Sequence, residues 1–172
     1  MAHSFNASEI SVVLMSDTHV PVRGRALPAK LWREVERADL VVHAGDWVSA
    51  ALLDELNARS RHLLGVYGNN DGSELRCRLP GIATATVGGV RVTVRHDTGD
   101  RDGRERRMAR AHPETDVLVF GHSHIPWDTT APDGLRMLNP GSPTDRRRQP
   151  HCTFMTATIA NGALTQVRLH RI

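Results

Sequence analysis

Residues 11–19 read SVVLMSDTH, a short apolar run followed at once by a serine, an aspartate, a threonine and a histidine. An apolar, β-branched run of this length fits a buried strand. Asp17 and His19 therefore stand just beyond the carboxyl end of that strand. The same arrangement recurs along the chain, and it is the feature from which we infer both the fold and the function.

Short apolar runs alternate with helical spacing in the first half of the chain and with tight-turn signals in the second. The pattern predicts strands over residues 11–15, 40–43, 63–67, 82–87, 90–94, 117–120, 154–159 and 164–169, and helices over 28–38, 48–56 and 105–112. Turns are expected at 88–89 (GG), 132–134 (PDG) and 161–162 (NG). The alternation implies right-handed crossovers and a parallel sheet that turns antiparallel towards the C-terminus. We expect one α/β domain over residues 1–172.

The composition argues against several classes of protein. No run approaches the ~20 apolar residues of a membrane span, and residues 1–9 hold no apolar leader. Cys77 and Cys152 form no C-x-x-C pair, so we expect a cytoplasmic protein with reduced thiols. The net charge of +3 comes almost wholly from arginine, since Lys30 is the only lysine. Because no aromatic residues interleave with the arginine clusters, we expect no nucleic-acid partner.

A carboxylate, an amide or an imidazole follows each strand of the predicted parallel sheet. These donors are Asp17, His19, Asp46, Asn69, His96, His122 and His124. In open α/β sheets, ligands bind at the edge where the carboxyl ends of the strands meet. Oxygen and imidazole donors without thiolate suit Mn, Fe, Zn, Co or Ni. Seven donors exceed what one ion needs, so we predict two divalent metal ions, with Mn²⁺ as the first expectation.

The ordered motifs resemble those of the calcineurin-like metallophosphoesterases. The resemblance rests on residues 16–19 (SDTH), 45–46 (GD), 68–71 (GNND), His96 and 121–124 (GHSH), and it spans roughly Val12 to Ser142. The short chain and residues 139–142 (NPGS) look most like the small YfcE-type phosphodiesterases. The resemblance implies an α/β fold, a four-layer α-β-β-α sandwich of two mixed β-sheets flanked by helices.

The resemblance also implies roles for the donors. One ion would be held by Asp17, His19, Asp46 and His124, and the other by Asp46, Asn69, His96 and His122. Asp46 would bridge the ions together with the hydroxide that attacks phosphorus, and the catalytic residues would be Asp46, Asn69 and Asn70. The implied substrate is a small phosphate ester, such as a nucleotide-like one, with a diester favoured over a monoester.

Two positions depart from the family pattern. Many members read G-N-H-[DE], but the third position here is Asn70, which cannot act as a general acid at ordinary pH. We therefore expect substrates with good leaving groups, or a metal-bound water as the acid. Relatives commonly read H-G-H where this chain has Arg95-His96-Asp97. The added Asp97 alters the substrate side of the site.

Other polar and aromatic residues near the motifs have structural interpretations. We expect His43 to be buried rather than to bind metal, Ser142 to shape a loop, and Trp47 to pack in the core. Asp71 could orient a ligand residue or simply close the turn. Arg23 fits an exposed loop arginine better than a contact to a substrate phosphate.

Two other functions compete with phosphoester hydrolysis. A protein-binding scaffold of the same fold, such as the retromer subunit, would lack a complete metal set, whereas all seven donors are present here. A nuclease would need an extra domain or an aromatic groove, which the sequence does not indicate. An exposed hairpin edge could support a homodimer.

Overall fold

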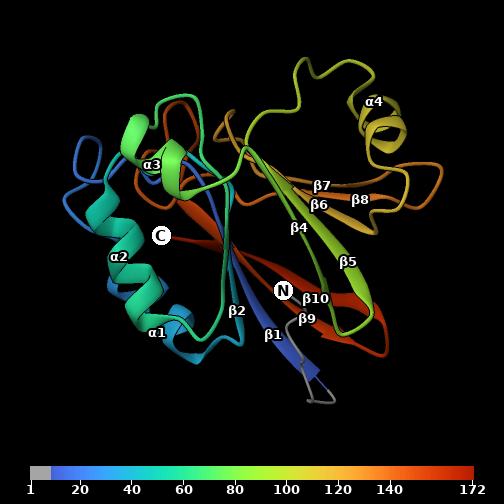
Figure 1. The fold of residues 1–172 in the computed structure, drawn as a ribbon, viewed down its shortest axis with the longest axis horizontal. Helices are drawn as coiled ribbons and strands as arrows, with labels where there is room; N and C mark the ends of the chain where they lie inside the picture. Colours follow the sequence, from blue (N-terminus) through green and yellow to red (C-terminus); the bar gives the residue numbers. More distant parts are fainter. Residues whose placement is uncertain (1–8) are drawn as a thin grey trace.

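The computed structural model describes residues 9–172 and arranges their strands in two five-stranded sheets (Figure 1). The first sheet runs in the order β10 (Ala163–Arg171), β9 (Thr153–Ala160), β1 (Glu9–Met15), β2 (Leu40–His43) and β3 (Leu63–Gly65). The second runs in the order β4 (Ile82–Val87), β5 (Val90–Arg95), β6 (Val117–Val119), β8 (Arg136–Asn139) and β7 (Trp127–Thr130). The sequence predicted no apolar leader in residues 1–9, and of these only Glu9 lies within the described residues.

Both sheets are mixed. In the first, β1, β2 and β3 pair in parallel while β9 and β10 run antiparallel to their neighbours. In the second, β5, β6 and β8 pair in parallel while β4 and β7 form antiparallel edges. The predicted strands and the three predicted tight turns are present, and the expected shift from parallel to antiparallel pairing is confirmed for the first sheet.

Within residues 9–172, four helices cover the outer faces of the sheets. The helices α1 (Ala29–Arg37), α2 (Ala50–Arg59) and α3 (Ser73–Arg78) lie against the first sheet, and α4 (Arg104–Ala111) lies against the second (Figure 1). The sequence predicted α1, α2 and α4 with slightly different ends. It did not predict α3, because three of its six residues are charged and Leu75 is the one that it buries.

Three apolar clusters hold these layers together. The first lies between the sheets and joins residues such as Val12 and Leu40 to Val92 and Val117. The second packs α1, α2 and α3 on the first sheet, and the third packs α4 on the second. The predicted sandwich of two mixed sheets flanked by helices is therefore confirmed. None of the helices within residues 9–172 is long and apolar enough to cross a bilayer.

The loops that carry the seven donors are joined to one another by backbone hydrogen bonds. The amide of Asp17, after β1, donates to the carbonyl of Gly45, after β2, over 2.9 Å. The amide of Gly121, after β6, donates to the carbonyl of His96, after β5, over 2.9 Å. The amide of His122, after β6, donates to a carboxylate oxygen of Asp17, after β1, over 3.0 Å. The carboxyl ends of strands from both sheets thus meet at one place, and this is where the candidate site lies.

Candidate metal centre

The backbone of the donor loops is strained. Five of the seven predicted donors have a positive φ: Asp17 (54°), His19 (44°), Asp46 (60°), His122 (69°) and His124 (58°). A residue other than glycine in this region costs of order 1–3 kcal/mol, and such strain clusters at functional sites. The surrounding hydrogen bonds hold these residues in a conformation that aims their side chains at a common point.

One group of donors consists of two imidazoles and a carboxylate. The Nε2 atoms of His19 and His124 are 3.3 Å apart. The Oδ1 atom of Asp17 lies 3.5 Å from the Nε2 of His124 and 4.0 Å from that of His19. All three side chains are buried. Three ligand atoms that converge in this way form a candidate site for one cation.

A second group surrounds His96. Its Nε2 lies 2.9 Å from the Oδ1 of Asn69 and 3.4 Å from the Oδ2 of Asp46. The same Oδ1 of Asn69 lies 2.9 Å from the Nδ1 of His122. The Oδ1 of Asp17 is also within 4.0 Å of the His96 Nε2. Asp17 therefore borders both groups, although the family resemblance assigned it to the first alone.

Asp46 lies between the two groups. Its Oδ2 is 3.5 Å from the Nε2 of His19, in the first group, and 3.4 Å from the Nε2 of His96, in the second. The structure thus brings all seven predicted donors together, and the carboxylates of Asp46 and Asp17 each lie within 4.0 Å of imidazoles from both groups.

Backbone carbonyls orient two of the histidines. The Nδ1 of His96 lies 2.7 Å from the carbonyl oxygen of Ala44, and the Nδ1 of His124 lies 2.6 Å from that of Asp145. A carbonyl only accepts, so each Nδ1 carries a proton, and in the neutral form that binds metal each Nε2 would turn its lone pair towards the donors. Without a metal, burial opposes protonation of His96, but the carboxylates of Asp46 and Asp17 raise its pKa. The sequence did not predict either carbonyl partner, because every residue type has a backbone carbonyl.

The electrostatics of the group fit a cation. Burial raises the pKa of Asp17 to about 7. Burial also opposes ionisation of Asp46, yet hydrogen bonding and charge from His96, with two hydrogen bonds from Asn70, hold the pKa of Asp46 well below its usual range. Burial lowers the pKa of His124 to about 4 and that of His19 as well. Neutral imidazoles are the form that coordinates metal, and a divalent cation would favour the ionised form of Asp17.

The residues after Asn69 act on Asp46. The amide of Asn70 donates to the Oδ1 of Asp46 over 2.8 Å, and its side-chain Nδ2 donates to the Oδ2 over 2.6 Å. The carboxylate of Asp71 accepts from the backbone amides of Asp46, Val48 and Gly68. Of the two sequence interpretations of Asp71, the structure supports the shaping of the turn, because its carboxylate holds the backbone rather than a ligand side chain.

His43, Trp47 and Ser142 have the structural roles that the sequence indicated. The amide of Gly45 donates to the Nδ1 of His43 over 3.2 Å, so the Nε2 carries the proton and donates to the Oγ1 of Thr18 over 3.0 Å. The buried ring of Trp47 stacks on that of His43. The hydroxyl of Ser142 donates to the carbonyl of Asp17 over 2.7 Å and so supports the first donor loop.

Two hollows border the centre. One, of about 600 Å³, includes Asn69 and His96 among its lining residues, and the other, of about 260 Å³, includes His19 and Asn70. The smaller one also contains Arg23, which is exposed and lies 3.9 Å from a carboxylate oxygen of Asp145. Each hollow therefore touches a different donor group.

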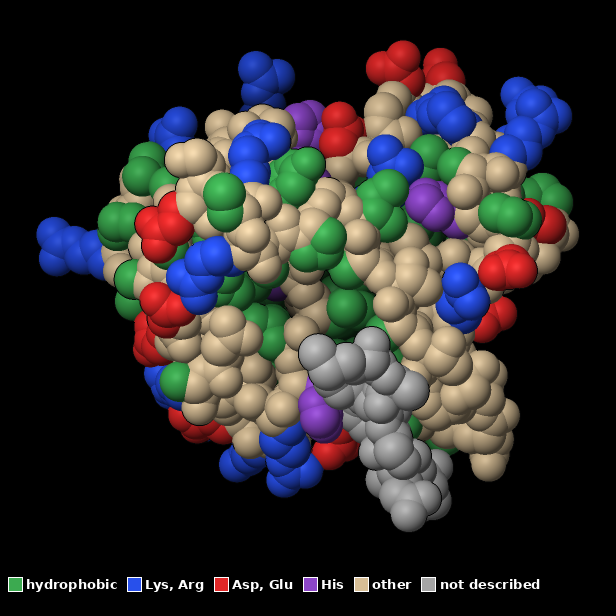
Figure 2. All heavy atoms as spheres, in the orientation of Figure 1, with side chains coloured by type: hydrophobic (Ala, Val, Ile, Leu, Met, Phe, Trp, Pro, Cys, Tyr) green, Lys and Arg blue, Asp and Glu red, His purple; other side chains and the backbone are tan. Residues whose placement is uncertain are grey.

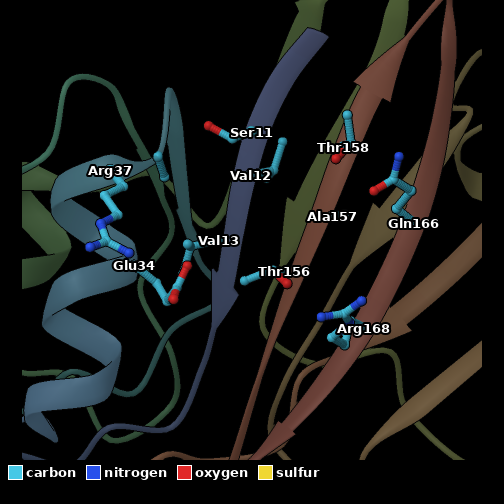
Figure 3. Close-up of a pocket in the computed structure, with 11 residues that line it drawn as sticks. Ser11, Val12, Val13, Glu34, Arg37, Thr156, Ala157, Thr158, Gln166 and Arg168 are labelled. Carbon is cyan, nitrogen blue, oxygen red and sulfur yellow. The ribbon is translucent and has the colours of Figure 1, made fainter.

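A third hollow lies on the outer face of the first sheet, between α1 and the strands β1, β9 and β10 (Figure 3). Its volume is about 290 Å³, and its lining includes Arg37, Thr156 and Arg168. None of the seven donors belongs to it. This hollow is therefore separate from the candidate metal centre.

The sequence matches the calcineurin-like phosphoesterase superfamily domain over residues 10–162. A probable metallophosphoesterase of Methanocaldococcus jannaschii is 34% identical over 132 residues, which cover 76% of this chain and 67% of that protein. A phosphodiesterase of the same organism is 26% identical over 140 residues, covering 77% and 83%.

Solved structures show the same architecture. The solution structure of a Thermotoga maritima protein superposes with a TM-score of 0.75 at 29% identity, covering 95% of this chain and 99% of that one. The Vps29 protein of Entamoeba histolytica, crystallised in complex with Zn²⁺, superposes with a TM-score of 0.75 at 23% identity, covering 95% and 98%.

Proposed function

Because the chain belongs to the calcineurin-like phosphoesterase superfamily, within its group of small phosphodiesterases, we propose that it uses two divalent metal ions to hydrolyse a small phosphate diester. The position of Asp46 carries this proposal. Its Oδ2 is 3.5 Å from the Nε2 of His19 and 3.4 Å from that of His96. A carboxylate shared by two ligand groups is what a pair of ions about 3.5–4 Å apart requires.

Each ion would have its own imidazoles. Asp17, His19, Asp46 and His124 would hold one ion, and Asp46, Asn69, His96 and His122 the other. When bound, such a pair supplies positive charge to the phosphoryl oxygens and a nucleophilic water at neutral pH. Mn²⁺ is our first expectation for this set of oxygen and imidazole donors, and Zn²⁺ is the second.

Asn70 and Asn69 would orient the ligands rather than move protons. Asn70 holds both oxygens of Asp46 through its amide and its side chain. The Oδ1 of Asn69 faces ring nitrogens of His96 and His122, at 2.9 Å from each. An asparagine cannot protonate a leaving group. We therefore expect esters whose alcohol leaves easily to be the better substrates.

The two hollows favour a diester over a monoester. A diester carries two organic arms on one phosphorus, and each donor group has a hollow beside it for one arm. A monoester has one arm and would leave the other hollow without a contact. The pocket beside Asn69 and His96 is the larger, at about 600 Å³, and would take the bulkier arm.

The face of the molecule shown in Figure 2 gives no support to a nuclease. On the face shown in Figure 2, arginine side chains are interspersed with acidic ones rather than gathered in one stripe. A polynucleotide groove needs a continuous basic track with aromatic residues along it. A scaffold without catalysis is also disfavoured, since all seven donors converge at one place.

Metal titration and diester hydrolysis test the proposal. We expect two Mn²⁺ ions per chain by calorimetry, and hydrolysis of bis-p-nitrophenyl phosphate that exceeds that of p-nitrophenyl phosphate and is abolished by EDTA. Asp46→Ala should abolish turnover, and Asp133→Ala, in the turn between β7 and β8, is the control. A chain that binds no metal and turns over neither ester would contradict the proposal and favour a scaffold.

A further inference from the structure

We propose that the hollow beside Asn69 and His96 binds a second anionic group, carried by the arm of the ester that lies there. The inference deepens the proposed function and rests on it, because the hollow borders the same donors. The two arginines of this hollow, Arg76 and Arg95, are held in place without being neutralised.

Arg95 is a half-buried cation with fixed geometry. Its Nε donates to the backbone carbonyl of Asp97 over 2.7 Å, and its Nη1 lies 3.4 Å from the Nε2 of His112. Burial and the charge of Arg95 lower the pKa of His112. The imidazole is thus a neutral acceptor, and it positions the guanidinium without cancelling its charge.

Arg76 is held by the loop that carries Asn69. Its Nε donates to the carbonyl of Asp71 over 2.7 Å, and its Nη2 donates to those of Gly68 and Asn69 over 3.1 and 3.2 Å. Its guanidinium also stacks 4.6 Å above the ring of Tyr67. Carbonyl acceptors fix the orientation of this cation, but they carry no net charge that could neutralise it.

The two arginines of this hollow have no carboxylate partner in the described part of the chain. Within residues 9–172, neither Arg76 nor Arg95 forms an ion pair with a carboxylate. Ion pairs are formed by Arg23, Arg59, Arg61, Arg78, Arg91, Arg136 and Arg147. The only acid among the lining residues is Asp97, whose Oδ1 accepts from the amide of Gly99 over 2.8 Å, so the two guanidinium groups outnumber the one carboxylate. Two fixed positive charges in one hollow favour a bound anion.

The rest of the hollow suits an organic arm. Tyr67, the one tyrosine of the chain, and Ile82, which is 49% exposed, add apolar surface to its lining. Gly81 leaves room beside the tyrosine, since a Cβ there would lie 2.9 Å from the Tyr67 Oη. Apolar surface next to two guanidinium groups fits the sugar and base of a nucleotide that bears a further phosphate.

Two chromogenic diesters that differ by one phosphate test the inference. Thymidine 5′-(p-nitrophenyl phosphate) has no second anion, whereas its 3′-phosphorylated form does. With Mn²⁺ and at low salt, we expect the 3′-phosphate to raise kcat/KM by at least roughly tenfold. Arg95→Gln should bring this ratio close to one, and Arg95→Lys, which keeps the charge, should retain most of it.

Arg110→Gln is the matched control, because it removes an exposed arginine on α4 and should leave the ratio as in the wild type. Ile82→Glu places a negative charge at the rim of the hollow and should lower the ratio even if Arg95→Gln does not fold. The inhibition constants of thymidine 3′,5′-bisphosphate and thymidine 5′-phosphate give the same comparison without turnover, and the bisphosphate should bind more tightly.

The possible failures are distinguishable. If neither diester is hydrolysed, the proposed function itself is wrong. If both are hydrolysed at similar kcat/KM by the wild type, or if the ratio survives in both Arg95→Gln and Ile82→Glu, the anionic subsite is wrong while the phosphodiesterase stands.

Discussion

The Oδ1 atom of Asp71 accepts a 2.7 Å hydrogen bond from the backbone amide of Val48, a β-branched residue with a φ of 75°. A positive φ is a true outlier for such a residue. The Oδ2 atom of Asp71 accepts from the amides of Asp46, over 3.0 Å, and Gly68, over 2.7 Å. One buried carboxylate thus fixes the turn that directs Asp46 at both donor groups.

Asp71→Asn should weaken both the fold and the metal centre. An amide has one acceptor oxygen, so its NH₂ group would face at least one backbone N–H. We expect a loss of about 1–3 kcal/mol in the free energy of unfolding and a fall of about 10–100-fold in Mn²⁺ affinity, measured by thermal unfolding and calorimetry. Asp102→Asn, at an exposed position, is the control. Unchanged affinity would show that Asp71 does not position Asp46.

Gly68→Ala should disturb the centre through a steric contact. A Cβ at Gly68 would lie 2.2 Å from the Oδ1 of Asp46 and 2.4 Å from its amide nitrogen. Since the backbone there cannot give way without moving the carboxylate of Asp46, we expect loss of Mn²⁺ binding and of diester hydrolysis. Gly72→Ala lies in the same loop with open space around it and should bind metal normally. Equal behaviour of the two variants would contradict this account.

The strand ends could be predicted from the sequence because apolar runs are short and each stops at a polar residue. The burial of β1, β2 and β6 agrees with this signal. The helix α3 could not be predicted, because a single buried apolar residue, Leu75, does not form a helical hydrophobic pattern. The assignment of strands to two sheets came from the family resemblance, since the apolar pattern does not indicate which strands pair.

The donor set was also predictable, because imidazole and carboxylate side chains at successive strand ends are distinctive. The groups that hold these donors in place could not be predicted from the sequence. The carbonyls of Ala44 and Asp145, which orient His96 and His124, are common to all residue types. The contact of Arg95 with His112 joins segments 17 residues apart, and no local pattern indicates it.

His43→Gln should make the stability of the protein less sensitive to acid. Burial lowers the pKa of His43 well below its usual 6.5. The unfolded chain therefore takes up a proton on this ring near pH 6.5, while the folded chain does not. The contribution of His43 to stability is complete above that pH and is lost as the pH falls below it, by up to about 1.4 kcal/mol per pH unit.

Glutamine keeps the donor to Thr18 and the acceptor for the amide of Gly45, but it takes up no proton. The free energy of unfolding of His43→Gln should therefore fall less steeply than that of the wild type between about pH 6.5 and pH 5. Urea denaturation in EDTA measures this without a contribution from bound metal. His151→Gln, at an exposed position, is the control. Parallel curves for His43→Gln and wild type would mean that the ring accepts a proton within the fold.

Asn70→His should raise monoesterase activity, most of all towards poor leaving groups. Asn70 is exposed in the smaller hollow and holds Asp46, so an imidazole there would lie beside the reacting phosphate. A histidine titrates near neutral pH and can donate a proton to a departing alcohol, which contributes about 10²–10⁴-fold in general acid catalysis. We therefore expect a larger gain in kcat/KM for glycerol 2-phosphate than for p-nitrophenyl phosphate, whose leaving group needs no proton. Asn70→Gln keeps an amide without an acid and should show no such difference. Equal gains for both esters in Asn70→His would place residue 70 away from the leaving group.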